Sequence, residues 1–501
     1  MTPGTTANPV PARDAGSALP LAVDLDGSLL LTDTLFEAVA EHMRRRPFWT
    51  ALQLIQLPFA IAKVKARLQR GVELDIETLP VNEAVLAYCR RAKAMGRSVW
   101  LVSAADQVVV EKIAARFDLF DRVFGSDGVT NNKGSNKARL LEQEAPGGFE
   151  YLGDSPADLK VWAKSKSAAI VGGGATRKQA VERMGVVVGR TFERPGGGIG
   201  AWSKALRLHQ WAKNALIFVP AILSMKIADL ATLATCAIAF PLLGLMASGT
   251  YLLNDILDLK ADRGHHSKYR RPLACGRIKL WQAFVAAPLL IIGSFVGAVV
   301  LSPAFAATLL FYLIITLGYS LSLKRVPLLD TMTLGFLYTL RLIMGGVLAG
   351  VFLSEWLVVF SMFLFVSLSL AKRHVEVLRR VAAGEQRIAS RGYRAEDASL
   401  TLGLGLATAT ASPLILVLYI IESAWPSGMY RTPDALWVAP AVLAIWLMRI
   451  WLLANREELH DDPVVFALKD AYSLALGVVL AVGFAIAAFA PPELLPWFSQ
   501  H

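Results

Sequence analysis

The stretch YLLNDILDLKADRGHHSKYRRPLACGRI, residues 251–278, begins as an apolar helix and becomes a dense field of charge within a few residues. One asparagine and three aspartates are spaced at i, i+1, i+4 and i+8, and on a helix this spacing stacks the aspartates along one face: Asn254, Asp255, Asp258 and Asp262. Like charges in register repel unless a cation lies among them, and Mg²⁺ that holds a diphosphate is the natural partner. The basic residues that follow are suited to further phosphate oxygens: Arg263, Lys268, Arg270 and Arg271. An ordinary basic loop beside a membrane is the alternative, but it does not explain the aspartates.

The composition around this stretch is that of a polytopic membrane protein. Of 501 residues, 54% are hydrophobic and 18% are charged. The net charge of +11 is explained by basic loops beside membrane spans, so no nucleic-acid partner is expected. The three cysteines form no disulfide framework or metal-binding spacing, which suits a reducing compartment. We interpret residues 1–18 as a disordered tail rather than a signal peptide, and we expect a C-terminal tail at 491–501.

Nine apolar segments are long enough to cross a bilayer as helices. They lie at about 211–228, 231–253, 281–300, 304–321, 329–350, 353–371, 400–420, 434–453 and 471–489. The loops after the second, fourth, sixth and eighth segments are strongly basic, whereas the opposite loops hold only Lys226 and Arg431. This asymmetry predicts a multi-pass protein of the bacterial cytoplasmic membrane, with the basic loops and the N-terminal part in the cytoplasm.

The N-terminal part alternates short apolar strands with helical stretches, which predicts a doubly wound α/β domain at 19–190. The strands are expected at 19–27, 98–104, 149–154 and 168–174. A helical insertion at 33–96 is interpreted as a cap on this domain. The alternative is that its segment RRRPFWTALQLIQLPFAIAKVKARLQR, residues 44–70, touches the bilayer as an interfacial helix. A linker at 191–203 leads to an all-α membrane domain at 204–490.

Polar residues follow the predicted strands where α/β folds place their active sites. Asp24 and Asp26 end the first strand, and Ser103 ends the second. Further along the chain come an ammonium and two more acids: Lys137, Asp154 and Asp158. Together they offer acids for a hard cation, and a hydroxyl and an ammonium for a phosphate.

In this order the motifs resemble the haloacid-dehalogenase phosphatase superfamily over residues 18–190. The resemblance implies that Asp24 is a nucleophile that forms an aspartyl-phosphate and that Asp26 is the acid and base. Ser103 and Lys137 would bind the phosphoryl group, with Lys133 as a substitute for Lys137. Mg²⁺ would lie between Asp24 and Asp154, supported by Asp158. A fold retained without activity is the alternative.

The acidic stretch resembles the first motif, N-D-x-x-D-x-x-x-D, of the UbiA-type polyprenyltransferase superfamily of nine-helix membrane enzymes, over 204–490. That family carries a second aspartate-rich motif after the sixth span, where this chain has SLSLAKRHVEVLRR with Lys372, Arg373 and Glu376. The chain is similar here to the decaprenyl-phosphate phosphoribosyltransferase branch, as it is in LRLHQWAKN and YSLSLKRVPLLD. These stretches supply further substrate-binding candidates: Arg207, Lys213, Asn214, Tyr319 and Lys324.

The branch implies phosphoribosyl transfer from phosphoribosyl pyrophosphate to a polyprenyl phosphate, with one Mg²⁺ site in each domain. In the membrane domain Asp255 and Asp258 would be catalytic, and with Asn254 and Asp262 they would hold the metal. The acceptor phosphate would be held by Lys372, Arg373 or Lys213, and the phosphatase domain would then remove the 5-phosphate of the product. The alternatives are an aromatic-acceptor polyprenyltransferase and a non-catalytic lipid-binding scaffold or transporter. The oligomeric state stays open, a homo-oligomer included.

Overall fold

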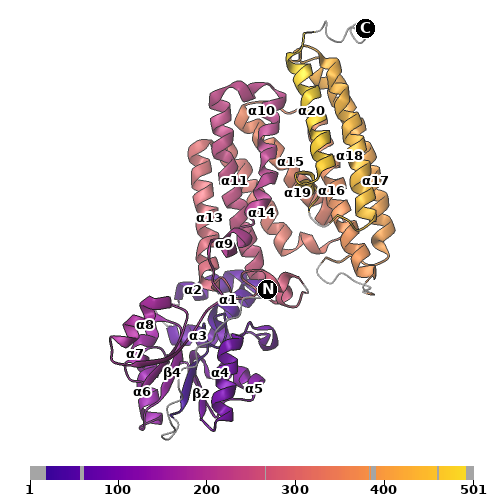
Figure 1. Ribbon diagram of the computed structural model, residues 1–501. Helices are drawn as coiled ribbons and strands as arrows, with labels where there is room; N and C mark the ends of the chain where they lie inside the picture. Colours follow the sequence, from indigo (N-terminus) through magenta and orange to yellow (C-terminus); the bar gives the residue numbers. More distant parts are fainter. Residues whose placement is uncertain are drawn as a thin grey trace, which may run out of the picture. The chain divides into compact units, whose positions relative to one another are not determined.

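The computed structural model describes most of the chain. The described residues are 19–56, 61–265, 267–382, 384, 391–459 and 462–491, so both predicted tails lie outside them apart from Pro491. The chain divides into two compact units. The α/β unit comprises the residues up to Ala205 together with Asp255–Val285, and the helical unit comprises Leu206–Asn254 and the residues from Ala286 onward. Figure 1 traces the chain through both.

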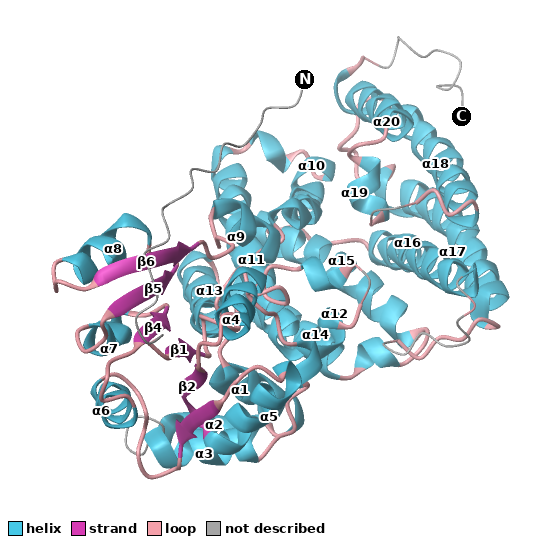
Figure 2. Cartoon of the chain, turned by 60° about the horizontal axis from the view of Figure 1, so that its bottom comes forward, coloured by secondary structure: helices cyan, strands magenta, loops and turns pink. Residues whose placement is uncertain are grey.

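The α/β unit contains a six-stranded sheet of order β3-β2-β1-β4-β5-β6 in which all neighbours run parallel (Figure 2). The strands are β1 (Leu21–Asp24), β2 (Val99–Asp106), β3 (Arg122–Ser126), β4 (Glu150–Gly153), β5 (Ser167–Val171) and β6 (Val187–Phe192). The four strands predicted from the sequence are confirmed. The other two, β3 and β6, are the edge strands, and they are not fully buried, so they lack the continuous apolar runs of central strands.

Apolar cores lie on both faces of this sheet. Leu21 and Val23 of β1 belong to one core, with residues of α4 (Glu83–Ala94) and α5 (Gln107–Phe117). Ala22 belongs to the other, with residues of α6 (Ser135–Glu144), α7 (Leu159–Trp162) and α8 (Gly174–Glu182). Successive residues of one strand therefore face opposite helical layers, which is the doubly wound arrangement.

Three helices and a short 3-10 turn separate β1 from α4. They are α1 (Thr34–Arg45), α2 (Pro47–Gln56), α3 (Ile61–Arg70) and η1 (Ile76–Thr78). The carboxylate of Asp33 caps α1, since it accepts hydrogen bonds from the backbone of Leu35 and Phe36. Helix α2 contacts α1 and α3 and leaves Phe48, Leu52 and Ile55 exposed.

The α/β unit also contains residues 255–285, which include the three aspartates of the acidic motif and the residues that follow them. This segment forms α12 (Leu259–Arg263), η5 (Lys268–Arg270) and the beginning of α13 (Leu280–Leu301). Gly276 has a φ of +73°, and a Cβ at this position would lie 2.6 Å from the Cβ of Leu31. Glycine therefore allows the segment to approach the loop after β1 closely.

Eight helices among the described residues are long and apolar enough to span a membrane. They are α11 (Leu230–Leu257), α13, α14 (Pro303–Leu321), α15 (Leu329–Ala349), α16 (Glu355–Ala382), α17 (Asp397–Tyr419), α18 (Val438–Asn455) and α20 (Ala471–Phe489). They coincide with the last eight of the nine predicted segments, so the protein is a multi-pass membrane protein.

The first predicted span, 211–228, is corrected by the structure. It forms no continuous helix but η3 (Leu208–Phe218), α10 (Val219–Leu223) and η4 (Lys226–Ala228). Pro220 stands in the first turn of α10, where its missing N–H is tolerated. Lys213 and Asn214, within η3, direct their side chains to polar partners elsewhere in the helical unit. The segment predicted as a linker likewise contains the end of β6 and the start of α9 (Ile199–Ala205).

Candidate active sites

Two aspartates stand at the carboxyl end of β1, the central strand of the sheet. Asp24 is the last residue of β1, and Asp26 follows in the turn, where it accepts a hydrogen bond of 2.8 Å from the backbone N–H of Thr34. Gly27 completes the turn with a φ of +82°, and a Cβ there would lie 2.5 Å from a carboxylate oxygen of Asp154. The turn can therefore approach the end of β4 this closely only with glycine.

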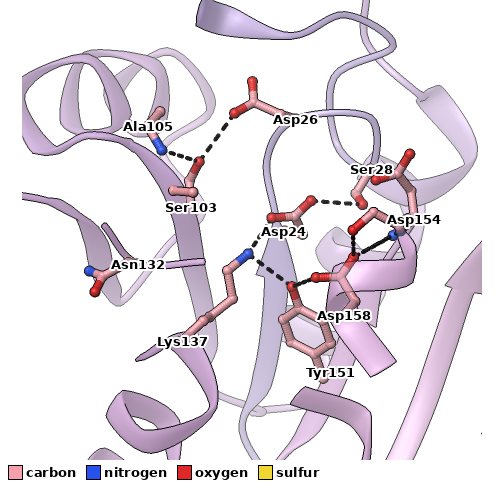
Figure 3. A network of polar contacts seen from close by, with 12 residues as sticks. Asp24, Asp26, Ser28, Ser103, Ala105, Asn132, Lys137, Tyr151, Asp154 and Asp158 are labelled. Carbon is pink, nitrogen blue, oxygen red and sulfur yellow. Dashed lines mark hydrogen bonds and ion pairs between the residues drawn. The ribbon is translucent and has the colours of Figure 1, made fainter. Parts of the chain in front are cut away.

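Neighbouring elements bring a hydroxyl and an ammonium to these aspartates (Figure 3). Ser103 of β2 lies with its Oγ 3.4 Å from Oδ2 of Asp26. Lys137 of α6 is buried and donates hydrogen bonds to Oδ1 of Asp24 at 2.5 Å and to the hydroxyl of Tyr151 at 2.9 Å. The predicted phosphate ligands and the predicted nucleophile thus meet at one edge of the sheet.

Asp24, Asp154 and Asp158 form a compact group of buried carboxylates. Each offers an oxygen, and these oxygens lie within 4.8 Å of one another. Asp158 is held in place by the hydroxyl of Tyr151 at 2.8 Å and by the backbone N–H of Ser155 at 2.9 Å. Carboxylate oxygens at this spacing are suited to a hard divalent cation, so the donor set fits Mg²⁺.

Burial changes the acidity of both aspartates after β1. It raises the pKa of Asp24 to about 8, although the ammonium of Lys137 acts in the opposite direction. Burial also raises the pKa of Asp26, opposed by the hydrogen bond from the backbone of Thr34. A raised pKa favours the protonated form of the carboxyl group, which is the form that donates a proton to a leaving oxygen, the role expected of Asp26. A bound divalent cation would favour the ionised form of Asp24.

The aspartates line a cavity of about 580 Å³. Three basic side chains that were not predicted as site residues line the same cavity. Lys65 of α3 lines it and donates to the carbonyl of Ala104 at 2.9 Å. Arg194 and Lys279 lie 3.4 and 3.2 Å from Oδ2 of Asp154. Arg194 follows β6, a strand that was not predicted, and Lys279 comes from the segment after the acidic motif. Exposed Lys133 also lines the cavity.

The acidic motif of the opening stretch does not lie on one unbroken helix, contrary to the prediction. Helix α11 ends at Leu257, and Asp258 is the N-cap residue that precedes α12. One guanidinium nitrogen of Arg271 lies 3.0 Å from Asp255 and 2.6 Å from Asp262. A single cationic group therefore reaches both carboxylates, whose oxygens are of the kind that a hard divalent cation prefers. Asp255, Asp258 and Asp262 do not form a three-carboxylate cluster within the 4.8 Å that joins Asp24, Asp154 and Asp158.

The basic residues after this motif have different surroundings. Arg263 donates to the carboxylate of Glu37 at 3.0 and 2.6 Å and to the carbonyl of Ala274 at 3.1 Å. Arg263, which was predicted to bind phosphate, thus joins α12 to α1. Lys268 and Arg270 lie in η5, where Lys268 is partly buried and Arg270 is exposed.

Two lysines and a tyrosine of the helical unit converge on one carboxylate. Lys213 lies 2.7 Å from Oδ2 of Asp462, and Lys372 lies 3.5 Å from the same oxygen. The hydroxyl of Tyr338 donates to Oδ1 of Asp462 at 3.0 Å. Both lysines were predicted as substrate ligands, whereas Tyr338 was not. Its position inside an apolar span gives no polar signal in the sequence.

Arg373, which follows Lys372, is buried in a second polar cluster. It forms an ion pair of 2.9 Å with Asp330, which is fully buried, and a close ion pair with Glu376. The hydroxyl of Tyr393 donates to Asp330 at 2.7 Å. The structure therefore separates the two adjacent cations: Arg373 is enclosed, whereas the side chain of Lys372 is 40% exposed.

The remaining predicted ligands also have polar partners within the helical unit. Lys324 donates to Asn254 at 3.2 Å. The guanidinium of Arg207 lies 4.6 Å from the ring centre of Tyr251, within the range of a cation–π contact. The other two contacts are Tyr319 with Arg391, at 2.6 Å, and Asn214 with Arg341, at 3.1 Å.

Arg341 was not predicted as a functional residue. It lies within the apolar span α15 and is buried. An ionisable residue at such a position is itself a signal of function, and it could have been read from the sequence.

Comparison with known proteins agrees with both units. The family model of the UbiA prenyltransferase family matches residues 216–474, and that of haloacid dehalogenase-like hydrolases matches residues 21–162. The uncharacterized protein y4nM of Sinorhizobium fredii is 40% identical over 477 residues, which are 94% of this chain and 91% of that protein.

Two further relatives have named roles. The nodulation protein NoeC of Azorhizobium caulinodans is 29% identical over 289 residues, covering 56% of this chain and 91% of that protein. A decaprenyl-phosphate phosphoribosyltransferase of Mycobacterium tuberculosis is 32% identical over 178 residues, covering 35% of this chain and 59% of that enzyme. The family matches and the similarity to y4nM along nearly the whole chain establish that this protein belongs to the UbiA prenyltransferase family and carries an N-terminal haloacid dehalogenase-like hydrolase domain.

Proposed function

We propose that the protein is a magnesium-dependent transferase that moves 5-phosphoribose from phosphoribosyl pyrophosphate to a polyprenyl phosphate of the decaprenyl type. The α/β unit would then remove the 5-phosphate and leave polyprenyl phosphoryl ribose. The motifs similar to the phosphoribosyltransferase branch support this proposal, as does the relative from Mycobacterium tuberculosis that carries that name.

The observation that carries the proposal is the cationic cluster at Asp462. Family members that use a prenyl diphosphate are expected to have a second group of aspartates after the sixth span. In the corresponding stretch this chain has Lys372, which lies within α16 rather than in a loop after a span, and Lys372 shares Asp462 with Lys213. A phosphate monoester has no diphosphate to release, so it needs ammonium groups more than a second metal ion.

The transfer step follows from these groups. Asp255, Asp258 and Asp262 would hold Mg²⁺, which when bound neutralises charge on the departing diphosphate. An oxygen of the acceptor phosphate, held by Lys213 and Lys372, attacks C1 of the ribose. The bond from C1 to the diphosphate oxygen breaks, and its electron pair leaves with the diphosphate. Because the second pKa of a phosphate monoester is about 6, the attacking oxygen is already ionised and requires no general base.

The phosphatase step uses the residues at the end of β1. A carboxylate oxygen of Asp24 attacks the phosphorus of the 5-phosphate, and the bond from phosphorus to the ribose oxygen breaks. Asp26 donates its proton to that oxygen and then takes a proton from the water that hydrolyses the aspartyl-phosphate. Ser103 and Lys137 bind the phosphoryl oxygens. Mg²⁺ held by Asp24, Asp154 and Asp158 would neutralise charge on the phosphoryl group.

An apolar cavity in the helical unit supports a lipid acceptor. Its volume is about 490 Å³, and its walls are mostly leucine, phenylalanine and other apolar side chains of the spans, among them Leu216, Phe360, Leu416 and Phe484. An isoprenoid chain is apolar along its length, so such a cavity suits part of its tail. The loop charges predict that the basic loops and the α/β unit lie on the cytoplasmic side, where a soluble sugar-phosphate donor would be available.

To test the proposal, the purified protein in lipid nanodiscs is incubated with ribose-labelled phosphoribosyl pyrophosphate, polyprenyl phosphate and Mg²⁺. Mass spectrometry of the lipids should detect polyprenyl phosphoryl ribose. The Asp24→Asn variant should accumulate the form that still bears the 5-phosphate. Transfer of a prenyl group to an aromatic acceptor without phosphoribosyl pyrophosphate would contradict the first step, and an unchanged yield of dephosphorylated lipid in Asp24→Asn would contradict the second.

A further inference from the structure

The wall of the phosphatase cavity includes the first residues of a membrane span. Leu280 and Trp281 begin α13, and both line the cavity that contains Asp24 and Asp26. The first turn of a spanning helix lies at the level of the lipid headgroups, where tryptophan is enriched. Trp281 is 45% exposed. Two residues at the start of a candidate membrane span therefore belong to the wall of this cavity.

Helix α2 gives a second, independent indication of a nearby bilayer. Phe48, Leu52 and Ile55 are 91%, 52% and 67% exposed, and their spacing of four and three residues places them on one face of the helix. An apolar face of this kind is typical of a helix that lies in the membrane interface. The arginines at 44–46 precede α2 and are exposed, so they suit the headgroups of anionic lipids.

The same helical insertion also contributes to the wall of the cavity. Helix α3 packs against α2 and carries Lys65 and Gln69 into the cavity wall. The apolar face of α2 and the cavity therefore belong to one packed group of helices. A membrane in contact with α2 would keep the mouth of the cavity close to the lipid surface.

The cavity wall has cationic side chains beyond the one at Asp24, and they stand among carboxylates, with Arg194 and Lys279 both beside Asp154. Lys137 is already placed at Asp24, where the phosphoryl group would react. Lys65, Arg194 and Lys279 line the same cavity, and Lys279 comes from the segment that follows the acidic motif. Cations beyond the reacting group are suited to a second anionic group of the same substrate.

We propose that the phosphatase cavity takes a phosphate monoester borne on a membrane lipid, and that Lys279 and Trp281 select this substrate. This inference rests on the proposed phosphatase activity and adds the residues that select its lipid substrate. Lys279 would bind the phosphodiester that joins the sugar to the lipid, and Trp281 would contact the adjoining part of the isoprenoid chain. A segment of the transferase thus completes the pocket of the phosphatase.

The test compares three substrates supplied directly to the full-length protein in nanodiscs, so that it does not depend on the transfer step. They are synthetic polyprenyl phosphoryl 5-phosphoribose, phosphatidic acid and soluble ribose 5-phosphate. We expect kcat/KM for the sugar-linked lipid to exceed that for ribose 5-phosphate by at least about tenfold. Lys279→Met and Trp281→Ala should each reduce the ratio of kcat/KM for the sugar-linked lipid to kcat/KM for ribose 5-phosphate by about tenfold, mainly through a higher KM for the lipid.

Lys260→Met is the matched control, because Lys260 lies in the same segment and pairs with Asp75 outside this cavity. It should keep the wild-type ratio. Equal kcat/KM values for the lipid and for ribose 5-phosphate would overturn the inference and leave 5-phosphate removal standing. A preference for phosphatidic acid over the sugar-linked lipid would support a lipid-borne substrate but contradict the proposed phosphatase substrate. Full activity in Asp24→Asn would contradict the phosphatase function itself.

A second measurement examines the membrane contact without any substrate. An environment-sensitive fluorophore at Leu52→Cys, in a Cys275→Ser background, should report an apolar environment in nanodiscs. The matched position is Glu142→Cys. Glu142 belongs to α6, outside the helical insertion, and its side chain is 44% exposed. It should report water. Identical, water-like emission at both positions would overturn the membrane contact of α2.

Discussion

Arg263 donates two hydrogen bonds, of 3.0 and 2.6 Å, to the carboxylate of Glu37, and both side chains are 6% exposed. The pair joins α12, which contains the last aspartate of the acidic motif, to α1, the first helix after β1. A buried ion pair is weak evidence for net stabilisation by itself, but loss of one partner leaves an uncompensated charge in a poorly solvated place. The pair therefore makes the two segments depend on each other.

Glu37→Ala should destabilise the α/β unit for this reason. We expect a loss of about 3–5 kcal/mol in the free energy of unfolding, because the buried guanidinium of Arg263 loses its counter-charge. The measurement is the thermal midpoint of the first unfolding transition of the full-length protein. Asp75→Ala breaks the more exposed pair with Lys260 and should cost no more than about 1 kcal/mol. Equal shifts in the two variants would contradict the prediction.

Lys137 and Lys133 are the two candidates for the phosphate-binding role, and their substitutions should affect hydrolysis to very different extents. Lys137 is buried and contacts Asp24, whereas Lys133 is exposed on the cavity wall. Lys137→Met should lower kcat/KM for phosphate ester hydrolysis by about 10²-fold or more, since it removes a preorganised cation from the reacting group. Lys133→Met is the matched change and should have a much smaller effect. The reverse order would assign the role to Lys133.

Much of the α/β site could be predicted because its residues follow buried strands. Asp24 and Ser103 come after continuous apolar runs, and parallel strands bring such positions to one edge of the sheet. Arg194 and Lys279 could not be found in this way. Arg194 follows an exposed edge strand without an apolar run, and Lys279 is distant in sequence and reaches the cavity only through tertiary packing.

The membrane spans were predictable from apolar length, but two local features were not. Lys213 and Asn214 interrupt the first expected span, and their partners Asp462 and Arg341 lie far along the chain. The break at Asp258 also depends on packing, because the residues around it have no proline or glycine that would end a helix. Tertiary contacts therefore override the local pattern at both places.

The stability of the metal-free protein should depend on pH through Asp24. Burial raises the pKa of Asp24 to about 8 in the folded protein, whereas an unfolded aspartate has a pKa of about 4. Between these values the folded state binds more protons than the unfolded state, so its stability falls as the pH rises. The Asp24→Asn variant lacks this group. Its free energy of unfolding should therefore fall less than that of the wild type as the pH rises from about 5 to about 8.

Thermal midpoints in the presence of EDTA measure this difference. Asp75→Asn serves as the control, since it removes an acid outside the cavity and should keep the pH dependence of the wild type. Parallel pH profiles for the wild type and Asp24→Asn would show that Asp24 is ionised in the folded protein without metal.

Lys372 should bind the lipid acceptor rather than the sugar donor. It lies 3.5 Å from Asp462 with a side chain 40% exposed, so its ammonium group remains accessible to a phosphate. Lys372→Met should raise KM for polyprenyl phosphate by about tenfold and leave KM for phosphoribosyl pyrophosphate nearly unchanged. Arg325→Met, a change to an exposed cation in the loop after α14, should alter neither constant. Steady-state kinetics with each substrate varied in turn separate these effects, and a higher KM for phosphoribosyl pyrophosphate alone would assign Lys372 to the donor instead.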